Sequence, residues 1–306
     1  MQIIRLEDYL YLVDLETGGI ENFIASYILK GKQAAIIETG PTLSVPNLLS
    51  SLKQLKIQPE NVAYVAVSHI HLDHGGGAGT LIKHLPKAKV IVHPRGASHL
   101  VNPEKLWQQS KIVLGEITKI YGEPEPVPAG RIIPAVDGVT FDVGNGITFK
   151  VVETLGHASH HVSYYEPLSY GVFTGDAAGI YLPEIDVIVP TTPPPFHPNV
   201  ALESLDKLVR LKPKVLYYSH FGKAENAMEK LQAYVQQIKL WERIAKEGVQ
   251  RGEDLEAVRK RIIENDEGVK KASKYLITHK VLSETTLRES IQGFIDFVKK
   301  EKESQK

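Results

Sequence analysis

One short segment constrains this chain more than any other feature. Residues 63–67 form an apolar run typical of a buried strand, and Ser68-His69-Ile70-His71-Leu72-Asp73-His74 follows at once, then three glycines. Side chains alternate along an extended segment, so His69, His71 and Asp73 should share one side while His74 takes a neighbouring direction. The segment therefore predicts four ligands that reach two adjacent points, as two neighbouring metal ions require. A polar surface loop is the alternative, but it explains poorly why four such groups fall within six residues.

Three more residues of the same kind stand at the ends of apolar runs. His157 follows residues 147–153, Asp176 follows residues 171–174, and His220 follows residues 215–218. Strand ends that gather along one edge of a sheet make a natural site. Each of these residues alone would more often be structural. Together with the first segment they are candidate ligands.

The periodicity predicts a mixed α/β chain with two β-rich halves and a helical end. Apolar and β-branched runs predict strands at 9–14, 23–29, 34–38, 63–67 and 89–93, then at 139–142, 147–153, 162–165, 171–174 and 215–218. Helical spacing marks 46–55, 104–121, 200–211, 224–247, 254–265 and 283–302. We place a boundary near Gly222, between a main domain (1–222) and a helical C-terminal extension (223–306).

At these residues the chain resembles the metallo-β-lactamase superfamily. The resemblance is carried by the His-x-His-x-Asp-His segment, then Gly156-His157, Gly175-Asp176 and Ser219-His220, in that order. It implies a four-layer αββα sandwich, with the glyoxalase II-like and thioesterase-like branches sharing the helical extension. It also implies a ligand set: His69, His71 and His157 for a first metal, Asp73, His74 and His220 for a second, with Asp176 bridging them.

The segment around His157 departs from the family pattern. Many members have Thr-Pro-Gly-His-Thr-x-Gly-His, whereas this chain has Thr154-Leu155-Gly156-His157-Ala158-Ser159-His160-His161. His161 matches the second histidine, and His160 stands where glycine is usual. His160 is either a partner of the ligands, a substrate contact or an ordinary surface residue.

The expected chemistry is hydrolysis by a metal-bridged hydroxide. The cofactors would be two divalent ions, with zinc favoured and iron or manganese also compatible with imidazole and carboxylate ligands. Asp73 would also orient the hydroxide and so be catalytic. The chain has no cysteine, which excludes a cysteine nucleophile and thiolate ligands, and no Gly-x-Ser-x-Gly element of a serine hydrolase.

Substrate contacts are predicted in the region between Asp176 and His220. Residues 190–198 contain five prolines, and Tyr181, Phe196 and His197 could line a pocket there. An ordinary surface loop is the alternative. An apolar, aromatic rim favours a carboxylic ester, thioester or lactone, although the helical part lacks a clear basic cluster for a glutathione carboxylate.

Other activities of the same superfamily stay open. A phosphodiesterase or nuclease is disfavoured because Lys+Arg and Asp+Glu balance at 36 each, whereas phosphate contacts need basic residues. An iron-dependent dioxygenase or oxidoreductase is a second alternative, although flavodiiron-type relatives usually have Glu where this chain has His71. A binding or regulatory protein that keeps the site is a third.

Neither a signal peptide nor a membrane span is expected. The first residues lack the pattern of a signal peptide, and no apolar stretch reaches the length of a membrane span. We therefore expect a cytoplasmic protein that acts on a small molecule, without a nucleic-acid or membrane partner. The C-terminal helices could cap the pocket or form a homodimer contact.

Overall fold

Two β-sheets form the centre of the chain in the computed structural model, which describes residues 2–276 and 284–304. The first sheet has the spatial order β1 (Ile3–Arg5), β2 (Leu10–Asp14), β3 (Ala25–Lys30), β4 (Ala34–Ile37), β5 (Val62–Ala66), β6 (Lys89–Val92) and β7 (Ile132–Pro134). The second has the order β15 (Gly222–Ala224), β14 (Val215–Tyr218), β11 (Gly171–Gly175), β10 (Val162–Glu166), β9 (Ile147–Glu153) and β8 (Thr140–Gly144).

The two sheets enclose a core of large apolar side chains. Tyr27 and Ile37 of the first sheet are fully buried in one cluster with Phe149, Tyr164 and Tyr217 of the second. Aromatic rings make close contacts across this layer, as between Tyr27 and Phe173, whose ring centroids lie 5.1 Å apart. Successive residues of such a strand alternate between this inner core and the outer, helix-covered one: Tyr27 lies in the first and Ile28 in the second.

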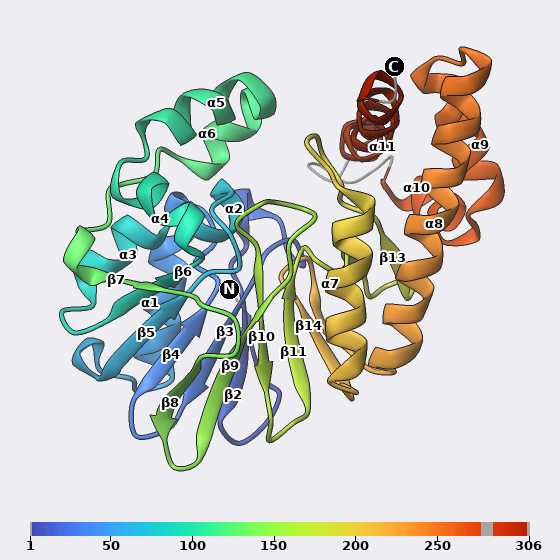
Figure 1. Cartoon of the computed structure of the whole chain (residues 1–306). Coiled ribbons are helices and arrows are strands. Elements are labelled where there is room, and N and C mark those ends of the chain that lie inside the picture. The colour runs from blue at the N-terminus through green and yellow to red at the C-terminus, as the bar shows by residue number, and fades with distance from the viewer. Residues whose placement is uncertain (1, 277–283, 305–306) are drawn as a thin grey trace.

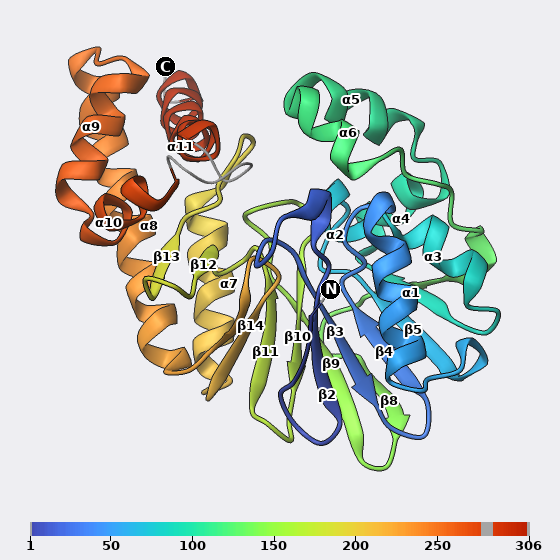
Figure 2. The same ribbon diagram turned by 180° about the vertical axis from the view of Figure 1, so that it is seen from behind.

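Helices cover the outer face of each sheet (Figures 1 and 2). The first sheet is covered by α1 (Val45–Gln54), α3 (Ala78–His84) and α4 (Pro94–Val101), whose apolar faces join one core with β4, β5 and β6. The second is covered by α7 (Pro198–Arg210) and α8 (Ala227–Arg251), whose apolar faces join a second core with β11 and β14. The predicted four-layer αββα sandwich is confirmed.

Four helices make up the C-terminal part that the structure describes. They are α8, α9 (Leu255–Asn265), α10 (Glu267–Leu276) and α11 (Glu284–Ser304). Leu231 and Trp241 of α8 are buried in the same cluster as Leu205 of α7 and Leu216 of β14. The helical extension thus shares a core with the second sheet, and β15, which begins at residue 222, adds to that sheet. The division at residue 222 stays a prediction.

Two segments differ from the sequence-based expectations. The helix predicted over 104–121 is wrong as one element, because α5 (Glu104–Leu114) ends before Gly115, whose φ of 52° is left-handed, and a separate α6 (Thr118–Tyr121) follows. Residues 180–189, for which the sequence analysis predicted no strand, form a hairpin of β12 (Ile180–Leu182) and β13 (Val187–Val189).

Strand direction determines where the candidate ligands lie. β14 is parallel to β11, and β10 is antiparallel to both β9 and β11, so β9, β11 and β14 all run the same way. Their carboxyl ends meet at one edge of the second sheet. β4 and β5 are likewise parallel, and α2 (Leu72–Gly75) follows β5 at the corresponding edge of the first sheet. In the described ranges, none of the helices combines the length and apolarity needed to cross a membrane.

Candidate metal centre

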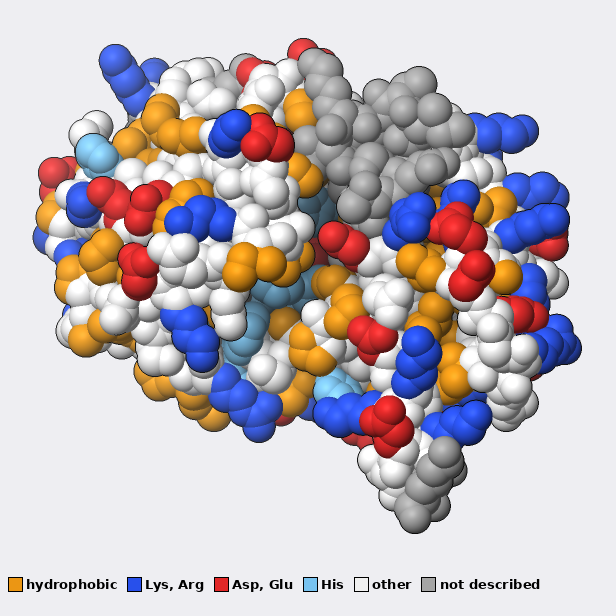
Figure 3. All heavy atoms as spheres, turned by 90° about the horizontal axis from the view of Figure 1, so that it is seen from above, with side chains coloured by type: hydrophobic (Ala, Val, Ile, Leu, Met, Phe, Trp, Pro, Cys, Tyr) orange, Lys and Arg blue, Asp and Glu red, His pale blue; other side chains and the backbone are white. Residues whose placement is uncertain are grey.

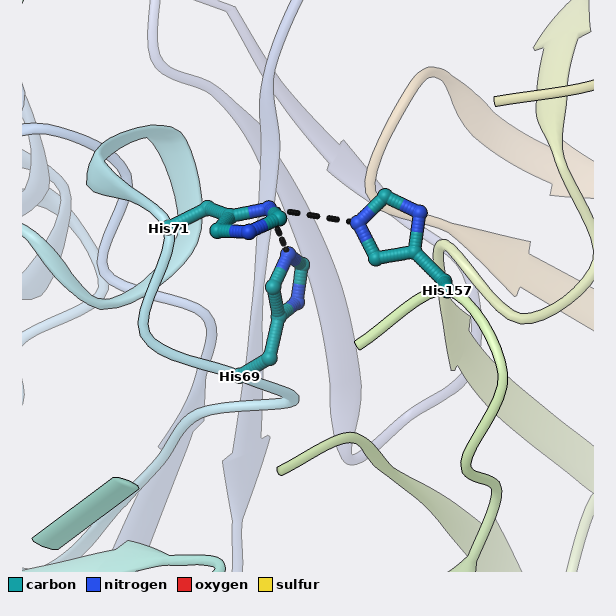
Figure 4. Close-up of side chains that lie close together, drawn as sticks. All are labelled: His69, His71 and His157. Atoms are coloured by element: carbon teal, nitrogen blue, oxygen red, sulfur yellow. Dashed lines mark hydrogen bonds between the residues drawn. The ribbon is translucent and has the colours of Figure 1, made fainter. Parts of the chain in front are cut away.

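All seven predicted ligands come together at this edge. Figure 4 shows His69 and His71, from the segment after β5, pointing toward His157, from the loop after β9. Three overlapping groups each bring their ligand atoms within 4.8 Å of one another: His69, His71 and His157; His69, His74 and Asp176; and Asp73, His74 and His220. Residues from two sheets and four loops therefore converge on one small volume that could hold metal.

The first group consists of three imidazoles. Nε2 of His69 lies 2.9 Å from Nδ1 of His71, and Nε2 of His157 lies 3.2 Å from that same atom. Burial and the neighbouring imidazoles lower the pKa of His69 well below its ordinary value. Burial and His157 likewise lower the pKa of His71 to about 3. Both rings are therefore neutral at physiological pH, and each keeps one nitrogen lone pair.

The group of Asp73, His74 and His220 combines two imidazoles with a carboxylate. Nε2 of His220 lies 3.3 Å from Oδ2 of Asp73 and 3.3 Å from Nε2 of His74. Burial opposes charge on His74, but Asp176, Glu38 and Asp73 outweigh it and raise the pKa of His74 well above its ordinary value. Burial also opposes charge on Asp73, yet His74 and His220 lower its pKa. This group is therefore arranged to hold positive charge.

Asp176 lies between the three imidazoles of the first group and the pair of His74 and His220. Its Oδ2 is 3.4 Å from Nε2 of His157, and its Oδ1 is 3.4 Å from Nε2 of His74 and 4.0 Å from Nε2 of His220. Burial raises the pKa of Asp176, but His74 and His157 lower it well below its ordinary value, so the carboxylate is ionised. Its buried Oδ1 has no hydrogen-bond partner among the described residues.

The donor set fits divalent cations. Neutral imidazoles and ionised carboxylates are the ligand types that zinc, iron and manganese accept. Ring nitrogens of neighbouring imidazoles lie at hydrogen-bond distance from one another, and a buried carboxylate oxygen is unpartnered in the part of the chain that the structure describes. A buried ionised group normally has such a partner or a metal. The residues therefore fit divalent metal ions, the kind of cofactor that the sequence predicts.

Ligand histidines also form hydrogen bonds through the ring nitrogen that faces away from the cluster. Their partners are groups that the sequence analysis did not single out. Nδ1 of His157 donates to the carbonyl oxygen of Thr191 (2.9 Å), and Nδ1 of His220 donates to that of Phe23 (2.9 Å). Such partners fix the tautomer of a ligand histidine. They come from distant parts of the chain, so only the folded structure could reveal them.

Glu38 is the most notable of these missed residues. It is 2% exposed, and its Oε2 lies 3.5 Å from Nδ1 of His74. Its φ of 67° falls in the left-handed region, a strained conformation for a residue with a side chain. One signal was available: Glu38 is the last residue of the strand predicted over 34–38, so it stands at a strand end, as the predicted ligands do.

His161 begins a chain of buried hydrogen bonds behind Asp176. The backbone N–H of Asp176 donates to Nε2 of His161 (3.0 Å), so Nδ1 carries the proton and donates to Oγ1 of Thr154 (2.9 Å). Thr154 in turn bonds to Ser163 (2.9 Å), which donates to the carbonyl oxygen of Thr174 (3.1 Å). His161 therefore supports the turn that carries Asp176.

His160 lies beside the first group rather than in it. Its ring is stacked with that of His69, with centroids 6.2 Å apart, and is edge-on to that of His71 at 5.9 Å. Burial and His157 lower its pKa to about 4, so the ring is neutral. Its buried Nδ1 has no hydrogen-bond partner within the described ranges.

None of the three predicted substrate contacts is among the clustered ligands, but two lie beside them: the N–H of Tyr181 donates to the carbonyl oxygen of His220 (2.5 Å), and that of His197 to the carbonyl oxygen of Gly156 (3.4 Å). Tyr181 donates from its hydroxyl to Asp186 (2.8 Å). Phe196 is 3% exposed and packs on Phe294 of α11, with ring centroids 4.9 Å apart. His197 is exposed. The role of these three residues in substrate binding stays a prediction.

The cluster opens to one face of the molecule. Figure 3 shows histidine side chains at the floor of a hollow, and the surrounding surface mixes acidic, basic and hydrophobic side chains. The side chain of Asp73 is 22% exposed, whereas those of His74 and Asp176 are 0% and 6% exposed. Asp73 is therefore the carboxylate of the cluster that a molecule entering from solvent would meet.

Comparison with known proteins agrees with this geometry. A model of the metallo-beta-lactamase superfamily matches residues 20–220, which include all seven clustered side chains. The chain is 30% identical, over 258 residues, to the metallo-beta-lactamase fold-containing protein ST1585 of Sulfurisphaera tokodaii, covering 81% of this chain and 91% of that protein. The chain therefore belongs to the metallo-beta-lactamase superfamily, whose members are generally metal-dependent hydrolases.

Solved structures give the same fold. The crystal structure of ST1585 has a TM-score of 0.64 at 28% identity and covers 74% of this chain and 85% of its own. The family protein TTHA1429 from Thermus thermophilus has a TM-score of 0.69 at 19% identity and covers 97% and 95%. A shorter match, 28% identical over 112 residues, is to a hydroxyacylglutathione hydrolase of Legionella pneumophila; it covers 37% of this chain and 32% of that protein.

Proposed function

We propose that this chain is a binuclear metal-dependent hydrolase of a carboxylic ester, thioester or lactone. His69, His71 and His157 would hold one divalent ion, and Asp73, His74 and His220 a second, with zinc favoured. The position of Asp176 supports this proposal most directly, because its two oxygens face different groups: Oδ2 faces His157, while Oδ1 faces His74 and His220. A carboxylate in that position can serve both ions.

The chain's own residues would then orient the reactants. Bound divalent ions supply Lewis acidity and lower the pKa of a water that they share. Asp73 can accept a hydrogen bond from that water, because its carboxylate is ionised and borders the hollow. The neutral rings of His69 and His71 supply lone pairs without first losing a proton. Glu38, placed behind His74, would hold that ring in the orientation that ligation needs.

A carbonyl substrate is favoured by two observations. The described side chains on the face around the hollow carry charges of both signs and hydrophobic groups, and among them there is no continuous basic surface of the kind that a nucleic-acid backbone needs. The partial match to a hydroxyacylglutathione hydrolase also supports an acyl substrate, since that name describes hydrolysis of an acyl conjugate. The glyoxalase II-like branch in particular stays a proposal.

One alternative has an observation in its favour. The chain is 25% identical, over 167 residues, to a putative diflavin flavoprotein of a Nostoc species, covering 55% of this chain and 24% of that protein. Iron in the same ligand set would make an oxidoreductase the competing function. Imidazole at His71, in place of the carboxylate that such relatives usually have, argues against it.

Metal analysis and a substrate panel test the proposal. Purified protein should hold close to two divalent ions per chain and lose at least one on His71→Ala. His84→Ala removes an exposed imidazole elsewhere and should change nothing. The panel pairs p-nitrophenyl acetate, acyl-thioesters and lactones with bis-p-nitrophenyl phosphate. Turnover of the phosphodiester alone would show that the proposed substrate class is wrong, and a single bound iron would favour the oxygenase.

A further inference from the structure

The loop that holds His157 is itself held by the C-terminal helix. His157 donates from Nδ1 to the carbonyl oxygen of Thr191 (2.9 Å), and the next N–H along the backbone, that of Thr192, donates to Oγ of Ser290 in α11 (3.2 Å). The Thr191 carbonyl and the Thr192 N–H belong to one peptide group. A single peptide group therefore lies between the ring of His157 and the hydroxyl of Ser290.

The geometry of that group makes the connection rigid. The peptide is planar and is not among the cis bonds of the described chain, so its C=O and N–H point in opposite directions. A hydrogen bond at one end polarises the group and strengthens the bond at the other. The hydroxyl of Ser290 thus affects the carbonyl oxygen of Thr191, which orients His157. It affects both the position of that oxygen and its strength as a hydrogen-bond acceptor.

Two further contacts fasten the same loop to α11. Oγ1 of Thr192 donates to the carbonyl oxygen of Ser290 (2.8 Å), and both residues are at most 1% exposed. A Cβ atom at Gly293, one turn further along α11, would lie only 1.9 Å from the carbonyl oxygen of Thr192. The absence of a side chain at Gly293 therefore allows the helix to approach the loop this closely.

We propose that α11 is a positioning element of the first metal site, with Ser290 and Gly293 as positioning residues that act on His157 through the Thr191–Thr192 peptide. The inference rests on the proposed function only in that His157 binds a metal ion. It gives the C-terminal helices a role within the site of a single chain. In the contacts described above, α11 meets the backbone and side chain of Thr192 and not the ligand side chains themselves.

The test uses the full chain loaded with Co²⁺. Ser290→Ala removes the hydroxyl while keeping a good helix former, and Gly293→Ala forces helix and loop apart. Ser51→Ala is the matched control for the first variant, since Ser51 is also fully buried in a helix but bonds within that helix, to Leu48 (2.6 Å). Gly130→Ala is the control for the second, because a Cβ atom at Gly130 meets nothing within 4 Å.

Two readouts are needed: the release of Co²⁺ to a chelator and the visible absorption spectrum of the bound ion. Loss of a direct partner of a ligand typically weakens metal binding about 10- to 100-fold, so removing Ser290, one group further out, should weaken one of the two ions about 3- to 10-fold. Gly293→Ala should have the larger effect, and both variants should alter the Co²⁺ spectrum. The controls should match the wild type.

Unchanged release and an unchanged spectrum in folded Ser290→Ala protein would overturn the proposal, and so would equal changes in Ser51→Ala. If Gly293→Ala does not fold, Ser290→Ala alone decides. Failure of the proposed function is distinguishable, because wild-type protein that binds two ions but hydrolyses nothing leaves the effect of Ser290 on Co²⁺ release intact. Protein that binds no divalent ion at all would overturn both.

Discussion

Oε2 of Glu38 lies 3.5 Å from Nδ1 of His74, while Oδ1 of Asp176 lies 3.4 Å from Nε2 of the same ring. A carboxylate therefore flanks the imidazole at each nitrogen. The outer carboxylate, Glu38, is buried and also accepts from the backbone N–H of Ser68 (3.2 Å). Its other oxygen, Oε1, also accepts from Oγ of Ser219 (3.4 Å), so Glu38 is fixed in place and faces the metal site directly through His74.

This pairing predicts the effect of Glu38→Gln. The substitution keeps the size of the side chain and removes its charge, so we expect about 10- to 100-fold weaker binding of one divalent ion. Chelator competition measures it. Glu166→Gln is the matched control, because Glu166 is a fully buried carboxylate that serves a turn near Tyr9. Equal loss in both variants would mean that Glu38 matters only for folding.

Asp176→Asn tests the position between the two groups. An amide presents one weak oxygen ligand instead of two charged ones, so it should weaken both ions and reduce turnover to near background. Asp142→Asn, an exposed carboxylate of β8, should leave both unchanged. Metal content and hydrolysis of the best ester or thioester are measured together. Wild-type turnover in Asp176→Asn would remove Asp176 from the catalytic site.

The chain of hydrogen bonds behind Asp176 predicts different outcomes at His161. His161→Leu leaves the buried N–H of Asp176 unpaired, which should cost about 1–3 kcal/mol of unfolding free energy. His161→Gln offers an amide oxygen to that N–H and should recover part of the loss. Urea denaturation compares the two. Equal stability of the Leu and Gln variants would contradict a role for this hydrogen bond.

Removing metal should lower the stability of the fold. A ligand that binds only the folded state stabilises it by about 2.7 kcal/mol when its free concentration is about 100 times Kd. We therefore expect chelator to lower Tm and added Zn²⁺, Fe²⁺ or Mn²⁺ to restore it, with the native ion giving the largest recovery. Scanning calorimetry measures this. A Tm that no divalent ion changes would contradict a metal site here.

The candidate site could be predicted from the sequence better than its surroundings. His69 to His74 lie within six residues after a buried strand, and His157, Asp176 and His220 each follow another, so local pattern alone pointed to all seven. The strands and the long helices were predicted for the same reason. Glu38, Thr191 and Ser290 were not found, because their roles depend on contacts between segments far apart in the chain.

The errors in the fold have a similar origin. Gly115 ends α5 through its left-handed backbone, and glycine within an otherwise helical pattern does not by itself reveal that conformation. Among the described strands, β12 and β13 form a sheet of their own, and the backbone of Tyr181 also bonds to residues 220 and 221. The hairpin packs through Val187 against α10 and its neighbours. Short strands of this kind carry little periodicity, so their existence follows from tertiary packing.

The clustered residues come from both sheets: His69, His71, Asp73 and His74 follow β5 of the first, whereas His157, Asp176 and His220 follow strands of the second. Among the described strands, none of the first sheet pairs with one of the second, and single hydrogen bonds join them, such as that from the N–H of Ala25 to the carbonyl oxygen of Ser219 (2.8 Å). Ions bound by both sets of residues would therefore act as non-covalent cross-links between the halves of the sandwich. Sliding of one sheet against the other would then require ligand exchange, which gives the metal-loaded chain a mechanical resistance beyond that of apolar packing and single hydrogen bonds.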